Sequence, residues 1–180
     1  APQLRVVPAR EIPPALLDQD ALRVVSRLQR SGYQAYLVGG CVRDLLLGYE
    51  PKDFDVSTNA TPEEIRDIFR RSRIVGRRFQ IVHVRSGREV IEVSTFRGHH
   101  SADFEPDSED EQPLEGSASY AESGMLLRDN VFGNVEEDAL RRDFSVNGLY
   151  YDPDANCVLD FSTGVADLEA RVLRVIGDPV

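Results

Sequence analysis

The sequence predicts an α+β fold, a small mixed sheet with helices packed against it on one side. Three observations lead to this prediction. Helical apolar spacing alternates with short strand-like runs, glycines and capping residues separate these segments, and no internal repeat is visible. A chain of 180 residues, 41% of them hydrophobic, can bury the core of one ordinary domain.

The first predicted element is an amphipathic helix over residues 20–31. Asp20 is expected to cap its start and Gly32 to end it. Its apolar residues recur at helical spacing, at Leu22, Val25 and Leu28.

Turn and cap signals delimit the remaining elements. Gly39-Gly40 and Gly48 bound a short helix, and Thr61 before Pro-Glu-Glu predicts a capping box. Ser86-Gly87 joins two strand-like runs and predicts a hairpin. We expect strands over 33–38, 53–57, 79–85, 89–96, 145–151 and 157–161, helices over 42–47, 62–71, 134–142 and 165–171, and a last extended segment over 173–176.

Charge is distributed unevenly along the chain, whose net charge is −10. Residues 1–19 are interpreted as an N-terminal extension of one domain over residues 20–180. Residues 102–123 are rich in Asp, Glu, Ser, Pro and Gly without an apolar period, which predicts a flexible acidic insertion. A local basic face can attract phosphate whatever the total charge. Arginines that could form one are Arg66, Arg70, Arg71, Arg73, Arg77, Arg78, Arg85 and Arg88.

The same composition argues against several classes of protein. No apolar run approaches the roughly 20 residues needed to span a bilayer, and residues 1–14 lack the order of a signal peptide. Cys41 and Cys157 have no metal-type spacing. We therefore expect a cytoplasmic protein with no membrane span.

The first candidate site is a glycine turn between a strand and a helix. Gly39 and Gly40 would let backbone amides approach a phosphate closely, next to the positive end of the helix. Arg43 could pair with a triphosphate from the first helical turn. Asp44 is expected to hold Arg43 or to cap the turn rather than to bind a metal ion. These residues are candidates for binding a nucleotide, although such a turn can also be purely structural.

The second candidate site is Lys52-Asp-Phe-Asp-Val56. Residues two apart in a strand point to the same face, so Asp53 and Asp55 would present two carboxylates side by side while Phe54 faces the core. Like charges this close repel each other unless a cation lies between them. Carboxylate oxygens suit Mg²⁺ or Mn²⁺, and phosphoryl transfer commonly uses such ions. An acidic strand edge facing water is the alternative.

The third candidate site is Arg141-Arg-Asp-143, which mixes phosphate-binding and metal-type side chains at a helix end. Ion pairs on a surface helix could also produce this pattern. Glu92 lies in an apolar strand, and it is either a third carboxylate of the site or a paired edge residue.

Five segments in this order resemble the class II branch of the DNA polymerase β-like nucleotidyltransferase superfamily, which contains bacterial poly(A) polymerases and CCA-adding enzymes. They are YLVGGCVRDLLLG, KDFDVSTNATPEEI, IEVSTFRG, EEDALRRDFSVNGLYY and LRVIGDP. The resemblance covers about residues 22–179 and implies a catalytic head with the polymerase β-like fold. Three segments are similar to the poly(A) polymerase branch in particular: VGRRFQIVHV, STFRGHH and GMLLRDNVFG.

The resemblance implies roles for individual residues. Asp53 and Asp55 match the positions that hold catalytic metal ions, and Asp143 matches the third catalytic carboxylate of poly(A) polymerases. Matches to nucleotide-binding positions are Gly40, Arg43 and Arg142.

The activity implied is template-independent addition of AMP from ATP to the 3′ end of RNA, with release of pyrophosphate. The alternative within the family is CCA addition to tRNA. Metal-dependent glycosyltransferases also use Asp-x-Asp, but no nucleotide-sugar βαβ unit precedes Asp53. A non-catalytic nucleotide- or RNA-binding module would not require three aspartates. In the family, neck and body domains follow the closing GDP; they are absent from this chain, so the RNA-binding surface is expected mostly outside it.

Overall fold

The computed structural model describes residues 4–98 and 132–177, so the expected acidic insertion over 102–123 lies outside the described residues. The described strands are β1 (Arg5–Pro8), β2 (Ala35–Val38), β3 (Asp55–Thr58), β4 (Ser72–Val75), β5 (Ile81–Ser86), β6 (Glu89–Thr95), β7 (Leu149–Asp152) and β8 (Cys157–Asp160). The helices are α1 (Gln19–Arg30), α2 (Gly40–Leu46), α3 (Pro62–Ile68), α5 (Val135–Leu140) and α6 (Gly164–Ala170), with 3₁₀ turns η1 (Pro14–Leu16) and η2 (Ser145–Asn147).

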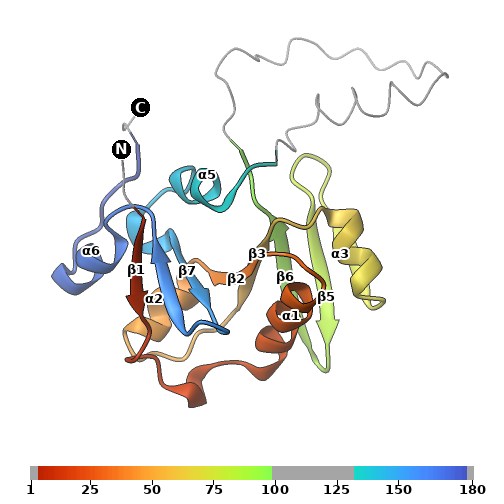
Figure 1. Cartoon of the computed structure of the whole chain (residues 1–180), viewed down its shortest axis with the longest axis horizontal. Helices are drawn as coiled ribbons and strands as arrows, with labels where there is room; N and C mark the ends of the chain where they lie inside the picture. The colour runs from red at the N-terminus through yellow and green to blue at the C-terminus, as the bar shows by residue number, and fades with distance from the viewer. Residues whose placement is uncertain (1–3, 99–131, 178–180) are drawn as a thin grey trace, which may run out of the picture.

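The strands form one mixed sheet in the order β1-β8-β7-β2-β3-β6-β5-β4. The central pair β3 and β6 is parallel, and the other neighbouring pairs are antiparallel. The α+β class and the mixed sheet predicted from the sequence are therefore confirmed (Figure 1). In the part of the chain that the structure describes, no helix is long and apolar enough to span a membrane.

Alternate strand residues separate two cores on opposite faces of the sheet. The larger core contains Leu37, Val56 and Val93 and is covered by α1, α2 and α3. The smaller core lies on the other face, where Ala139 of α5 packs with Val38, Phe96, Tyr150 and Phe161. Helices therefore cover both faces, not one as the sequence suggested, and Figure 1 shows α5 apart from α1 and α3.

Caps and turns fall close to their predicted positions. Thr61 forms the predicted capping box with Glu64, and α3 ends at Ile68 rather than near residue 71. The expected cap at Asp20 was wrong, because Asp18 accepts the hydrogen bond from the Ala21 amide. Asp20 lies in the first turn of α1, where it accepts a hydrogen bond from Ser86 at 2.8 Å.

The two edge strands were not anticipated. β1 lies in the segment interpreted as an extension, yet it pairs with β8, and Ala9 and Ile12 after it are buried in the larger core. β4 has the sequence SRIV and pairs with β5. Edge strands of four residues carry little alternation of their own, and their pairing depends on the neighbouring strand.

Truncating Leu37, which is fully buried in β2 beside the glycine turn, should destabilise the fold strongly. We expect Leu37→Ala to lower the free energy of unfolding by about 2–5 kcal/mol through lost burial and a residual cavity. Urea unfolding measures this change. Leu173→Ala is the control, because Leu173 is 66% exposed, and a loss as large as that of Leu37→Ala would contradict the assigned core.

Candidate active site

The register of the central strands places carboxylates next to each other. Asp55, the first residue of β3, lies opposite Val38 of β2 and beside Glu92 of β6. Asp53 precedes the strand, and Phe54 between the two aspartates packs against the larger core, as predicted from the alternation. Glu92 thus belongs to the same face as Asp55, and its Oε1 also lies 3.4 Å from His83 Nε2.

These carboxylates are electrostatically costly. Partial burial raises the pKa of Asp55, the charge of Glu92 raises it further, and that of Asp53 adds a smaller increase. Among these influences only the charge of Arg142 lowers the pKa of Asp55. An ionised Asp55 therefore gains from any cation placed at this end of β3.

A pocket of about 180 Å³ opens in front of Asp55. It combines the two carboxylates of Asp55 and Glu92 with three guanidinium groups. The pocket can therefore bind both a cation and phosphate groups. Its lining residues are Val38, Asp55, Ile81, Glu92, Ser94, Arg97, Arg141 and Arg142. Arg97 was not singled out from the sequence, although it stands in the segment IEVSTFRG; its pKa is lowered by burial and by Arg141 and Arg142.

Arg142 is held in place by a buried pair of side chains on α5 and β7. Its Nη2 lies 3.1 Å from Asp138 Oδ2, and its Nε donates to Tyr150 Oη at 3.1 Å. Tyr150 in turn donates to Asp138 at 2.5 Å, and a weaker contact joins Arg142 to Ser57 at 3.5 Å. Burial disfavours the charge on Asp138, but Arg142 and Tyr150 outweigh burial and lower its pKa. Asp138 therefore positions Arg142.

The sequence pattern indicated Arg142 but not Asp138. Tyr150 is fully buried, and burial raises the pKa of its hydroxyl. The spacing of four residues between Asp138 and Arg142 was the available signal, since such residues meet on one helical face.

The glycine turn borders the same site. Gly39 has a φ of +81°, which L side chains rarely adopt, and a Cβ there would lie 3.9 Å from Arg142 Nη1. A Cβ on Gly40 would lie 3.2 Å from the guanidinium of Arg43. Arg43 donates to Asp44 at 3.1 Å and to Asn147 at 3.0 Å, so Asp44 holds Arg43 as predicted. The turn thus lies close to two of the predicted nucleotide-binding arginines.

The other two predicted aspartates lie outside the pocket of Asp55. Asp53 lines a neighbouring groove with Lys52 and Glu89. Asp143 is exposed, and its Oδ1 accepts a hydrogen bond from the Phe144 amide at 2.8 Å. The structure thus brings Asp55, Glu92 and Arg142 together, whereas Asp143 does not line their pocket.

The donor set fits a hard divalent cation with few protein ligands. Within residues 4–98 and 132–177, no group of three or more His, Cys, Asp or Glu side chains is arranged to hold a metal ion. Two carboxylates from Asp53 and Asp55 would therefore leave most positions to water and substrate oxygens. Mg²⁺ is commonly bound in this way, through one or two carboxylates and substrate phosphates.

Comparison with known families identifies the family of the chain. The model of the poly(A) polymerase head domain matches residues 35–174, from the start of β2 to beyond α6. The chain belongs to this family. This match confirms the family that the five sequence segments indicated.

Individual relatives agree with that assignment. The head domain is 54% identical over 171 residues to "Poly(A) polymerase I" of Haemophilus influenzae, covering 94% of this chain and 36% of the relative. It is 35% identical to a "CCA-adding enzyme" of Streptococcus suis, covering 89% and 35%. The crystal structure of the Bacillus stearothermophilus CCA-adding enzyme in complex with CTP aligns with a TM-score of 0.68 at 31% identity, covering 88% and 33%. The chain spans about a third of the length of these proteins.

Neutralising Asp138 should loosen Arg142 and change the response of stability to acid. The pKa of Asp138 is lowered in the folded state, so its ionisation contributes stability above the ordinary pKa of an aspartate, and this contribution is lost as pH falls through the lowered value. We expect Asp138→Asn to cost about 2–3 kcal/mol at neutral pH. The difference from the unchanged chain should shrink at acidic pH.

Urea unfolding across a pH series measures this effect. The matched control is Glu136→Gln, which removes an exposed carboxylate from the same helix. A loss of stability that is the same for both variants, or one that is constant with pH, would contradict the role assigned to Asp138.

Proposed function

We propose that the protein is a template-independent nucleotidyltransferase that adds AMP from ATP to the 3′ end of RNA and releases pyrophosphate. The observation that carries this proposal is the meeting of unlike charges at one end of the sheet. Asp55 and Glu92 lie in the same pocket as Arg97, Arg141 and Arg142. Attack of an RNA hydroxyl on the α-phosphorus of ATP needs a cation near the reacting atoms and fixed positive charge along the triphosphate.

The chain's own residues divide this work between them. Asp53 and Asp55 would hold Mg²⁺ or Mn²⁺. The bound ion would lower the pKa of the attacking hydroxyl and neutralise charge on the triphosphate. Arg142, fixed by Asp138 and Tyr150, would orient the phosphates without reorganising during the reaction.

The glycine turn would complete the nucleotide site. Gly39 and Gly40 allow close approach of the backbone, and Arg43 is held by Asp44 and Asn147 beside them. Asp143 is exposed and follows Arg142 directly in the chain. The third-carboxylate role of Asp143 rests on the family resemblance.

Polyadenylation is favoured over CCA addition by sequence similarity. Identity reaches 54% with "Poly(A) polymerase I" of Haemophilus influenzae but 35% with the "CCA-adding enzyme" of Streptococcus suis over a similar share of the chain. The solved relative that was crystallised with CTP is 31% identical. RNA and ATP are therefore the substrates we propose.

Binding of metal and nucleotide can be tested without turnover. Mg²⁺ or Mn²⁺ added together with ATP should raise the melting temperature, because both bind the folded state preferentially. Asp53→Asn combined with Asp55→Asn should abolish this shift. The fold should persist, since the variant removes the repulsion that raises the pKa of Asp55. Glu11→Gln combined with Glu169→Gln removes two exposed carboxylates that line neither the pocket of Asp55 nor the groove of Asp53, and this variant is the control.

An undiminished metal-dependent shift in the Asp53 and Asp55 double variant would contradict the metal site. Nucleotide choice is tested by supplying the full-length protein with each of the four NTPs and either tRNA or unstructured RNA. Preferential incorporation of AMP on both RNAs supports polyadenylation. Incorporation of CMP followed by AMP on tRNA alone would indicate the alternative, CCA addition.

A further inference from the structure

A row of four side chains crosses the sheet from its β4 edge to Asp55. Arg73 of β4 lies opposite His83 of β5, His83 lies opposite Glu92 of β6, and Glu92 lies beside Asp55 of β3. Residues paired in this way project from the same face of a sheet. Three strand spacings separate the ends of the row, so the Cα atoms of Arg73 and Asp55 are roughly 14 Å apart.

The charge of the side chains changes sign along the row. Glu92 and Asp55 are acidic at the central end, whereas Arg73 begins a basic area at the edge. His83 stands between them, 3.4 Å from Glu92. A nucleic-acid strand lying along the row would therefore have its phosphates over the arginine and its terminus over the carboxylates.

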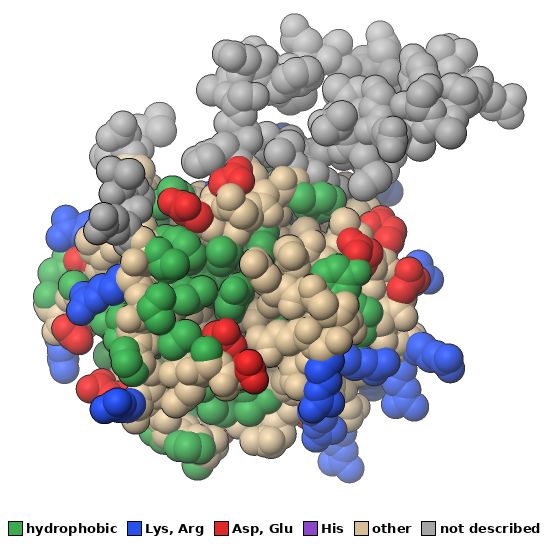
Figure 2. Space-filling model, in the orientation of Figure 1, with side chains coloured by type: hydrophobic (Ala, Val, Ile, Leu, Met, Phe, Trp, Pro, Cys, Tyr) green, Lys and Arg blue, Asp and Glu red, His purple; other side chains and the backbone are tan. Residues whose placement is uncertain are grey.

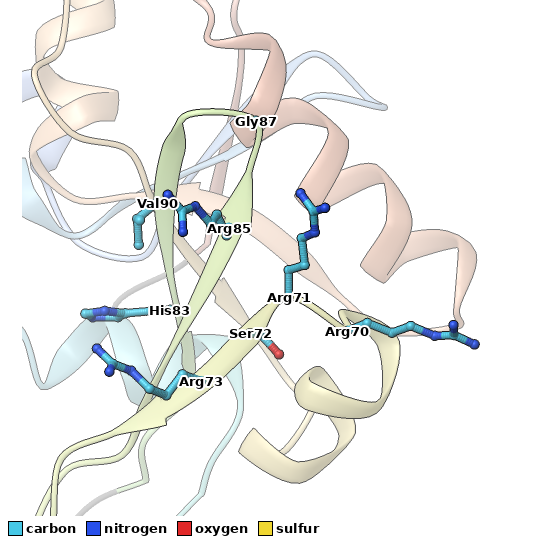
Figure 3. A pocket seen from close by; sticks show the side chains of 8 residues that line it. All are labelled: Arg70, Arg71, Ser72, Arg73, His83, Arg85, Gly87 and Val90. Atoms are coloured by element: carbon cyan, nitrogen blue, oxygen red, sulfur yellow. The ribbon is translucent and has the colours of Figure 1, made fainter.

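The basic end is an open groove of about 810 Å³ over β4 and β5. Figure 3 shows Arg73, His83 and Arg85 projecting to one side of these strands, whereas Arg70 points away from them. Arg71, Arg73 and Arg85 are exposed, and among the described residues none of their side chains has an ion pair or hydrogen bond. Lys and Arg side chains also gather over α1 and α3 in Figure 2, but these helices cover the other face of the sheet.

This groove lies across Asp55 from the glycine turn and Arg43, two of the features assigned to the triphosphate. Gly39 follows β2 and Arg43 lies in α2, and β2 is the neighbour of β3 on the side away from β6, β5 and β4. Arg142 contacts Tyr150 of β7, beyond β2, and also lines the pocket of Asp55. In phosphoryl transfer the attacking and leaving oxygens are roughly in line. If the pyrophosphate leaves on the β2 side, the attacking strand has to arrive from the β6 side.

We propose that Arg73 and Arg85, with Arg71 beside them, bind the phosphate backbone of the RNA just upstream of its 3′ end and guide that end along the row to Asp55. This inference rests on the proposed function and adds the path of the RNA. Unpaired guanidinium groups suit this task because they contact phosphate without reading sequence. Their local charge offsets the repulsion that a net charge of −10 exerts on a polyanion.

The test compares two double variants of the full-length protein. Arg73→Gln with Arg85→Gln removes two of the four arginines that line the groove. Arg5→Gln with Arg10→Gln removes the same charge from exposed positions in or just after β1, at the opposite edge of the sheet. The probe is a 5′-fluorescein-labelled oligoadenylate of roughly 12 nucleotides, followed by fluorescence anisotropy over a salt series. The groove variant should bind about tenfold more weakly. Its slope of log affinity against log salt should fall by roughly 1.4, the value for two lost phosphate contacts on a single strand.

Two further readouts separate this inference from the proposed function. The melting shift produced by Mg²⁺ and ATP should be the same in both variants and the unchanged protein, since the groove does not touch the nucleotide. An RNA carrying photoreactive 4-thiouridine near its 3′ end should crosslink to β4 or β5.

Three results would overturn the proposal. The first is that the groove variant binds RNA with the same affinity as the control variant, while Mg²⁺ and ATP still raise the melting temperature of both. Another is a crosslink confined to other elements. The third is a groove that binds polyglutamate as well as it binds RNA, which would assign it to an acidic protein partner. A missing metal–ATP shift in the unchanged protein would instead contradict the nucleotidyltransferase function itself.

Discussion

The repulsion between carboxylates at the central strands is the constraint on which the rest of the site depends. The parallel register of β3 and β6 fixes Asp55 beside Glu92, and Asp53 precedes Asp55 by two residues. Burial and this repulsion both raise the pKa of Asp55. Arg142 offsets part of it and is itself kept in place by Asp138 and Tyr150. A fold that keeps such a cluster at the mouth of a pocket is suited to a divalent cation and a phosphorylated substrate.

The two faces of the sheet have different tasks. The larger core under α1, α2 and α3 stabilises the strands, whereas the other face carries the polar groups and is covered only in part by α5. Ala139 of α5 packs there with Val38, Phe96 and Tyr150. Asp138 of the same helix binds Arg142, which lines the pocket of Asp55. The same helix thus contributes to the core and to the site, which links stability to nucleotide binding.

Several features of the fold and of the site were predictable from the sequence. Alternation around Phe54 predicted that Asp55 turns away from the core, and glycines and capping boxes located α2 and α3. Long-range pairing was not predictable, because nothing local in SRIV or RVVP records which strand each one joins. For the same reason Glu92 remained ambiguous until its register with Asp55 was known. Arg97 and Asp138 were missed because their roles arise from contacts between separate segments.

The most direct test of the central claim is a crystal structure with Mn²⁺ and a non-hydrolysable ATP analogue, in which anomalous scattering locates the metal. We expect Mn²⁺ between the carboxylates of Asp53 and Asp55, with the triphosphate extending toward Arg142 and the Gly39-Gly40 turn. Mn²⁺ bound away from both aspartates, or a triphosphate lying over β4 and β5, would contradict this account.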